Sequence, residues 1–283
     1  MAVRLLIDSS SDFPKSEAES LGLTFLPLTV QWEGQSFRDQ IDLNHQEFYT
    51  RLIEQADPPT TCQLTPYDYE EVLKPLTENG DKVVIIALSS KLSGTCQSAQ
   101  IAAREFPGQV FVVDSLNVTF GEQILIRYAI RLRDEGMAAE EMVQRLDGVK
   151  GRIRLIALVD TLEYLRRGGR VSAVAAAAGG LLSIKPVVAV EDGEVRVIGK
   201  ARGSKKANNL LTELIAKNGG VDFSMPYALG YSGLEDGTLK KYVADSAALW
   251  ADHTDHLPVS TIGAVIGTHV GPGAVGAAFF SKE

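Results

Sequence analysis

The sequence predicts an α/β protein, and three observations support that class. Residues 3–7 form a short apolar run, and residues 83–88 and 110–113 are apolar on both faces, as strands covered by helices should be. Segments with helical periodicity separate these runs, and such alternation is typical of parallel βαβ units. The chain of 283 residues, 45% hydrophobic and 23% charged, is long enough for one large or two medium domains.

Residues 1–150 are predicted to form an N-terminal α/β domain with a mostly parallel sheet. Asp12 and Pro14 suit the start of a helix, and Gly22 suits its end. Residues 23–32 are expected to form one strand, and part of the segment 24–60 is expected to pack on the second domain. The helices expected in this half lie at residues 13–21, 45–55, 67–79, 99–106, 121–135 and 139–146.

A second α/β domain is predicted for residues 151–283, beyond a boundary near 148–151. Residues 184–198 are expected to form a hairpin around Asp192 and Gly193. The small apolar residues of segment 171–182 permit close backbone approach or line a narrow tunnel. The other expected elements are strands 154–159 and 227–231 and helices 162–167, 207–217 and 234–250.

The composition narrows the class of protein. The net charge of −8 argues against non-specific binding to nucleic acid or to an anionic membrane. Two cysteines, Cys62 and Cys96, provide neither a disulfide framework nor a clustered metal site. The chain shows no signal peptide, and no apolar run approaches the ~20 residues that cross a bilayer, so the cytoplasm is the expected location. Nucleotide-binding glycine motifs, the Gly-x-Ser-x-Gly elbow and the His-Glu-x-x-His motif are also missing, so no cofactor and no metal are expected.

The stretch 88–99 is predicted to carry an anion site. It follows an apolar strand and precedes a helix, and open α/β sheets bind ligands at this edge. The amino end of the helix offers free backbone N–H groups, Ser93 and Thr95 add hydroxyl groups, and Gly94 allows close approach. A plain helix cap is the alternative interpretation, because serine and threonine are favoured there in any case.

Three further segments carry polar groups. Residues 8–12 follow the first strand, and they either cap local structure or lie beside the Ser93 turn at the same sheet edge. Residues 61–63 follow a proline pair and form either a linker or a second set of donors, with Cys62 expected to be a small packed residue. His269 lies among five glycines in the stretch 259–276, and we expect it to contact a ligand.

Basic residues gather at two places. Arg166, Arg167 and Arg170 surround a glycine pair, where they complement a helix dipole or form a surface for phosphate or an acidic partner. The segment 199–206 carries Arg202 and three lysines just before a predicted helix. Positive charge is unfavourable at that end of a helix, so local rules do not explain this group and a functional role is expected.

Together, these stretches resemble the DegV family, the fatty-acid-binding proteins that serve bacterial fatty acid kinase. The most specific matches are Leu-Ser-Ser-Lys-Leu-Ser-Gly-Thr and Gly-Thr-His-Val-Gly-Pro-Gly-Ala. The resemblance extends over nearly the whole chain through segments 8–12, 61–63, 88–99, 160–172, 181–186 and 266–276.

The resemblance implies two α/β domains with a long-chain fatty acid between them and its tail in an apolar tunnel. Carried over residue by residue, the carboxylate binders are Thr61 and Ser93, with His269 close by and the Gly94 N–H group available. Arg170 and Arg202 match positions that engage the kinase subunit or the phosphorylated head group.

Two residues depart from the family's usual pattern. Cys62 stands where the family mostly has serine, and Cys96 stands where it usually has an aromatic residue. Both departures leave the assignment of Thr61 and Ser93 intact, but they bear on head-group packing and acyl-chain preference.

The resemblance also implies a carrier role rather than an enzyme. The protein is expected to present the carboxyl group to the catalytic subunit of a fatty acid kinase and to carry away the acyl phosphate, with transient membrane contact left open. Two other classes remain open at this point. One is an acyl hydrolase or transferase that uses Ser93 with His269, and the other is a binder of small polar ligands of the phosphosugar type.

Overall fold

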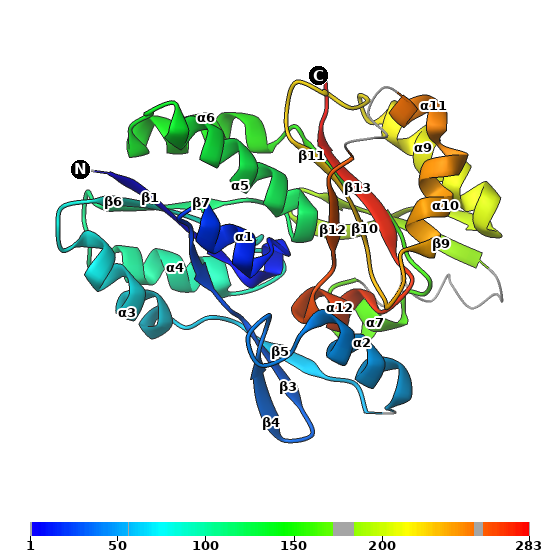
Figure 1. Ribbon diagram of the computed structural model, residues 1–283, viewed down its shortest axis with the longest axis horizontal. Helices are drawn as coiled ribbons and strands as arrows, with labels where there is room; N and C mark the ends of the chain where they lie inside the picture. Colours follow the sequence, from blue (N-terminus) through cyan, green and yellow to red (C-terminus); the bar gives the residue numbers. More distant parts are fainter. Residues whose placement is uncertain (1, 56, 172–183, 252–256, 283) are drawn as a thin grey trace.

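The computed structural model describes residues 2–55, 57–171, 184–251 and 257–282. A four-stranded sheet in the order β2-β1-β6-β7 forms the first half (Figure 1). Its strands are β1 (Val3–Asp8), β2 (Thr24–Leu26), β6 (Lys82–Ala87) and β7 (Val110–Asp114), and all their pairings are parallel. The expected parallel sheet is therefore confirmed, and its polar carboxyl edge faces the middle of the molecule.

Helices cover both faces of this sheet. Helices α3 (Pro66–Thr77) and α4 (Thr95–Ala103) contact each other and β6 on one face. Helices α5 (Thr119–Asp134) and α6 (Ala139–Lys150) pack on the other face, where α5 contacts β1 and α6 contacts β7 (Figure 1). The short helices η1 (Ser9–Ser11) and α1 (Lys15–Ser20) follow β1.

A six-stranded mixed sheet in the order β10-β9-β8-β13-β11-β12 forms the second half. Helix α9 (Ser204–Lys217) packs against β8 and β9, and α5 packs on the same sheet at β8, β11 and β13. Helix α5 thus lies between the two sheets, and residues of both sheets share one buried core. The strands are β8 (Ile153–Leu158), β9 (Ile184–Glu191), β10 (Glu194–Arg202), β11 (Tyr227–Tyr231), β12 (Val259–Thr261) and β13 (Val275–Phe280).

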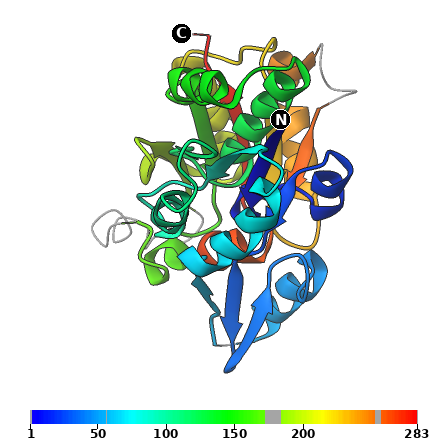
Figure 2. The same cartoon turned by 90° about the vertical axis from the view of Figure 1, so that its left-hand side faces the viewer.

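A small third sheet, β4-β3-β5, projects from the molecule together with α2 (His45–Glu54) (Figure 2). It consists of β3 (Thr29–Trp32), β4 (Gln35–Arg38) and β5 (Thr60–Cys62). Helix α12 (Ala264–Val270) contacts α2, β3 and β5, and it also contacts α7 (Glu163–Arg167). Segment 24–60 therefore packs against an element of the second half, although the division into domains 1–150 and 151–283 stays a prediction.

Several expected element bounds are wrong. Residues 23–32 form two strands in different sheets, because Pro27 cannot donate to a ladder and the chain leaves the first sheet there. Helix α4 begins four residues earlier than expected, at Thr95. The expected helix 234–250 is divided into α10 (Gly237–Asp245) and α11 (Ala247–Trp250), and the hydroxyl group of Ser246 bonds back to the Tyr242 carbonyl oxygen at the break.

The basic segment 199–206 also differs from the expectation. Strand β10 extends through Arg202, so this arginine ends a hairpin strand and only the lysines at 205 and 206 lie in the first turn of α9. The expected hairpin around Asp192 and Gly193 is confirmed. The expected tunnel-lining segment 171–182 lies, apart from its first residue, outside the described residues.

A candidate ligand-binding cavity between the two sheets

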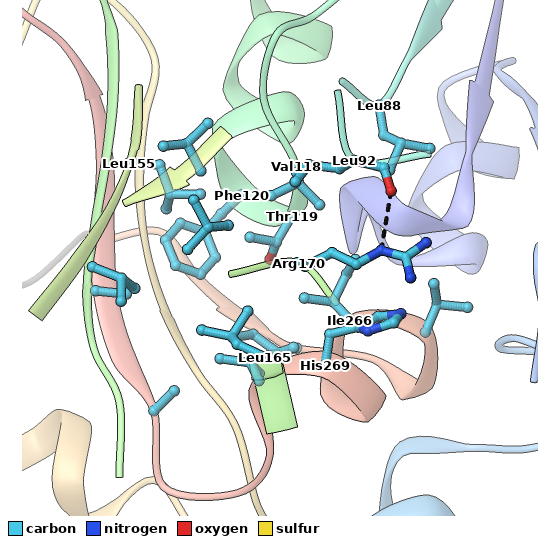
Figure 3. A pocket seen from close by; sticks show the side chains of 18 of the residues that line it. Leu88, Leu92, Val118, Thr119, Phe120, Leu155, Leu165, Arg170, Ile266 and His269 are labelled. Atoms are coloured by element: carbon cyan, nitrogen blue, oxygen red, sulfur yellow. Dashed lines mark hydrogen bonds between the residues drawn. The ribbon is translucent and has the colours of Figure 1, made fainter. Parts of the chain in front are cut away.

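A cavity of about 380 Å³ lies between the carboxyl edge of the parallel sheet and the inner face of the six-stranded sheet. Its wall is apolar on the side of β8, β9 and β13 and polar on the side of β5 and the Ser93 turn. The lining side chains converge on one space from elements far apart in the sequence (Figure 3). Such a volume falls within the roughly 300–1,000 Å³ that is usual for ligand pockets.

Thr61 and His269 meet at the polar end of this cavity. The Thr61 Oγ1 atom lies 2.9 Å from His269 Nε2, although 208 residues separate them in the chain. Strand β5 carries Thr61 and helix α12 carries His269, so the contact between these two elements brings the pair together. Both residues line the cavity.

The Ser93 turn supplies the second hydroxyl group of the polar end. Ser93 Oγ lies 3.0 Å from Thr95 Oγ1, and the Thr95 N–H group donates to Ser93 Oγ at 3.3 Å. The buried Thr95 hydroxyl oxygen also accepts a hydrogen bond from Leu64 N, which connects this turn to the loop that follows β5. The turn is thus a helix N-terminus, and Ser93 lines the cavity as well.

Gly94 lies beside the cavity without lining it. A methyl group built onto Gly94 would lie 2.3 Å from Gln63 Oε1, so the missing side chain makes room for Gln63. Gln63 itself lines the cavity, and sequence reasoning placed it only as one of several donors on a loop. The close approach that we expected of a ligand at Gly94 is made by a protein side chain in this structure.

The two arginines singled out in the sequence lie in different places. Arg170 lines the cavity, where its Nε atom donates to Leu92 O at 3.1 Å (Figure 3). Its Nη1 atom donates to Gly168 O at 2.5 Å. Arg202 is exposed at the end of β10 and does not line the cavity. The polar end therefore includes the Arg170 guanidinium group, which two backbone carbonyl groups hold in place. The sequence around the glycine pair did not predict this position.

His269 is neutral at physiological pH. Its burial, and after that the positive charge of Arg170, lower the pKa of His269 from 6.5 to about 4. The Nδ1 atom is buried and has no hydrogen-bond partner among the residues that the structure describes. A neutral imidazole whose Nε2 atom carries the proton can donate to Thr61, and the Thr61 hydroxyl group is then free to donate into the cavity.

Buried carboxyl groups hold the walls of the cavity. Asp8 accepts hydrogen bonds from Ser10 N at 2.9 Å and from Leu88 N at 3.1 Å, so it both caps η1 and joins the ends of β1 and β6. Asp12 accepts from Thr119 Oγ1 at 2.5 Å and from Gly263 N at 2.7 Å. Burial raises the pKa of both carboxyl groups.

The loop 8–12 therefore does more than cap local structure, which was one of the two interpretations of its sequence. Asp12 does not cap α1, because Pro14 occupies that position. Its backbone is left-handed, with φ of 51°, and its carboxyl group joins the starts of α5 and α12 instead. Long-range bonds of this kind have no signal in the local sequence.

The two cysteines also differ from expectation. Cys62 is exposed and lines the cavity, so the prediction of a packed residue is wrong. Strand β5 is a short edge strand, which leaves its last side chain at the surface. Cys96 is buried, and burial raises the pKa of its thiol to about 12.

Within the part of the chain that the structure describes, no three His, Cys, Asp or Glu side chains are arranged to hold a metal ion. A search of the same residues finds no helix with the length and apolar character needed to span a bilayer.

The fold and the cavity define an α/β protein in which an apolar pocket with a hydroxyl-rich end lies between a parallel and a mixed sheet. A family model described as "Uncharacterised protein, DegV family" matches residues 2–282, and the chain belongs to this DegV family. A DegV domain-containing protein of Caldanaerobacter subterraneus subsp. tengcongensis is 37% identical, over 99% of both chains.

Solved structures of the family have the same fold. A structure described as fatty acid binding of a DegV family protein from Thermus thermophilus has a TM-score of 0.87 and 33% identity, and it covers 99% of this chain and 100% of that one. A DegV lipid-binding protein from Thermotoga maritima has a TM-score of 0.82 and 30% identity, covering 100% of this chain and 99% of that one. The expected resemblance is therefore confirmed.

Proposed function

We propose that this protein binds a long-chain fatty acid in the cavity between its two sheets. The observation that carries the proposal is the pairing of Thr61 with His269 at the polar end of an otherwise apolar cavity, with Ser93 on the same wall. The Thermus thermophilus structure is described as binding a fatty acid, and the Thermotoga maritima protein is described as lipid-binding.

The two ends of the cavity match the two parts of a fatty acid. Each buried methylene contributes about 0.8 kcal/mol, so a sixteen-carbon tail gains on the order of 10 kcal/mol before ordering costs are subtracted. An ionised carboxylate must be hydrogen-bonded when it leaves water. The hydroxyl groups of Thr61 and Ser93 meet that requirement at the end of the cavity where the polar side chains gather.

Both hydroxyl groups are oriented by a second donor. When the neutral His269 carries its proton on Nε2, this atom donates to Thr61 Oγ1 and leaves the Thr61 proton for the carboxylate. The Thr95 backbone N–H group donates to Ser93 Oγ, which leaves the Ser93 proton for the other carboxylate oxygen. Arg170 contributes positive potential, while its bonds to two carbonyl groups hold it against the wall.

Mass spectrometry of lipid extracted from the purified protein tests this proposal. Wild-type protein should release long-chain fatty acid, and the double variant Thr61→Ala, Ser93→Ala should release little or none. The double variant Thr60→Ala, Ser90→Ala is the matched control, because both of these side chains are exposed and neither lines the cavity. Equal lipid content in all three proteins would overturn the assignment of the carboxylate site.

We further propose that the protein presents the carboxyl group to a partner kinase, as the family resemblance implies, and that Arg202 contacts this partner. The supporting observation is that Arg202 is exposed next to the exposed lysines 205 and 206. In an assay of acyl phosphate formation with the kinase subunit, Arg202→Glu should lose turnover and retain bound fatty acid. Lys217→Glu, at an exposed position on the far end of α9, is the control and should behave as wild type.

The two alternatives have less support from the geometry. An acyl hydrolase would pair Ser93 with His269, whereas Ser93 pairs with Thr95 and His269 pairs with Thr61. His269 Nδ1 also has no orienting acid among the described residues. A phosphosugar-type ligand would leave the apolar wall of β8, β9 and β13 without a matching surface.

A further inference from the structure

The apolar wall of the cavity contains a row of residues paired across four strands, and the first three of them are glycine or alanine. Gly230 on β11 pairs with Gly276 on β13, which pairs with Ala157 on β8, which in turn pairs with Val188 on β9. Residues paired in register point to the same face of a sheet. The last three of them line the cavity, so this row faces inward, and we call the strip of cavity along it the channel.

The ring of Phe120 fills the Gly230 end of this channel. A methyl group built onto Gly230 would lie 2.3 Å from Phe120 Cε1 and 2.4 Å from Cδ1, so the ring rests on the bare backbone of β11. Phe120 is fully buried and lines the cavity. In Figure 3 the Phe120 side chain points away from Arg170 and His269.

The backbone of Phe120 is held in place. Phe120 lies in the first turn of α5, directly after Thr119, whose backbone is left-handed with φ of 48°. The Thr119 hydroxyl group is bonded to the buried Asp12, and Gly121 fits closely against Leu155 and Asn117. Strand β11 therefore blocks the Phe120 ring on one side, and the ring can move only toward the cavity.

We propose that Phe120, seated on Gly230, ends the channel for the acyl tail and thereby sets the longest chain that the protein accepts. This inference rests on the proposed function. An acyl tail that enters from the Thr61 end and follows the channel meets the Phe120 ring before it reaches β11. The depth of the apolar site then depends on the Phe120 ring and on the absence of a side chain at Gly230.

Two substitutions change this depth in opposite directions. Gly230→Ala pushes the ring into the cavity, because a contact of 2.3 Å cannot persist and the sheet backbone blocks the other side. Phe120→Leu removes ring volume and lengthens the channel. In the double variant, the new methyl group at position 230 occupies space that the ring has left. Its chain-length preference should therefore return toward that of the wild type.

Competition binding against a fluorescent fatty acid measures the preference. We compare stearic with myristic acid for the wild type, Gly230→Ala, Phe120→Leu and the double variant, with Gly148→Ala as control because nothing lies near its added methyl group. Gly230→Ala should shift the affinity ratio toward myristic acid by about tenfold, the discrimination that one or two poorly accommodated methylenes produce. Phe120→Leu should shift the ratio toward stearic acid.

The outcomes separate the two proposals. If wild-type protein binds neither acid, the proposed function fails. If it binds both, and neither Gly230→Ala nor Phe120→Leu changes the ratio relative to Gly148→Ala, the role of Phe120 is overturned. Should Gly230→Ala fail to fold, as judged by circular dichroism, the affinity ratio of Phe120→Leu alone decides whether Phe120 sets the chain length.

Discussion

Gly168 lies directly against the imidazole ring of His269. A methyl group built onto Gly168 would lie 2.1 Å from His269 Nδ1 and 2.9 Å from Cε1. Gly168 ends α7, and α7 packs against α12, which carries His269. The glycine therefore fixes how close the imidazole ring can lie to α7, and with it the position of the Nε2 atom that reaches Thr61.

Gly168→Ala should weaken fatty-acid binding. The added methyl group must displace the His269 ring, and the displaced ring can no longer orient the Thr61 hydroxyl group. We expect the Kd for a fluorescent fatty acid to rise about tenfold, which corresponds to the loss of one hydrogen bond of ordinary strength. Gly151→Ala is the matched control, because Gly151 also ends a helix with a similar backbone and has open space around it. An equal Kd for both variants would contradict this account.

His269 should remain neutral at neutral pH in the ligand-free protein. Burial and the charge of Arg170 both oppose protonation and lower its pKa to about 4. In an NMR titration, the imidazole signals assigned to His269 should therefore show no transition between about pH 6 and pH 8, where an ordinary histidine titrates. Arg170→Gln should raise the pKa of His269, since it removes the positive charge. An unchanged pKa in that variant would contradict the stated effect of the Arg170 charge, and an imidazolium signal of His269 at neutral pH in wild type would contradict its neutral state.

Asp39 should make the free energy of unfolding depend on pH. Burial raises the pKa of this carboxyl group from 3.8 to about 6, so the folded state binds its proton more tightly than the unfolded state does. Its contribution is fully present below about pH 4 and is lost as the pH rises through about 6, a change of about 3 kcal/mol. Asp39→Asn keeps an acceptor for Ala264 N and should flatten this part of the profile.

Urea unfolding at a series of pH values measures the Asp39 contribution. Asp147→Asn is the control, because Asp147 lies at the surface beside Lys150. Parallel profiles for wild type and Asp39→Asn between about pH 4 and pH 7 would show that burial does not perturb Asp39 as stated.

The two cysteines should differ sharply in reactivity. Cys62 is exposed at the cavity wall, whereas the buried Cys96 thiol has a pKa of about 12 and stays protonated. A thiol reagent should therefore modify Cys62 in the native protein and both cysteines only after unfolding. Bound fatty acid should slow the reaction of Cys62. Cys62→Ser removes the native reaction, and a fast native reaction that persists in this variant would mean that Cys96 is accessible.

Much of the fold was predictable because its signals are local. The apolar runs of β6 and β7 are continuous and short, and the hairpin turn at Asp192 and Gly193 has a left-handed backbone that these residue types tolerate. Pro27 shows the limit of such reasoning. The run around it is apolar enough for one strand, but the lost donor separates β2 from β3 and sends them to different sheets.

The sequence pointed to several residues that line the candidate cavity, but it did not predict how they are arranged. The sequence indicates polar turns at Thr61 and Ser93 and an unusual histidine at position 269, and family resemblance connects them. The bond between Thr61 and His269 depends on the packing of β5 against α12, which no local pattern encodes. The placement of Arg170 inside the cavity and the support of its wall by Asp12 arise from the same long-range packing.

A crystal structure of the protein with a bound long-chain fatty acid tests the central claim most directly. The account predicts one carboxylate oxygen within hydrogen-bond distance of Thr61 Oγ1 and the other within that distance of Ser93 Oγ, with the tail against β8, β9 and β13. A carboxylate bound elsewhere, or a tail lying outside this cavity, would contradict it.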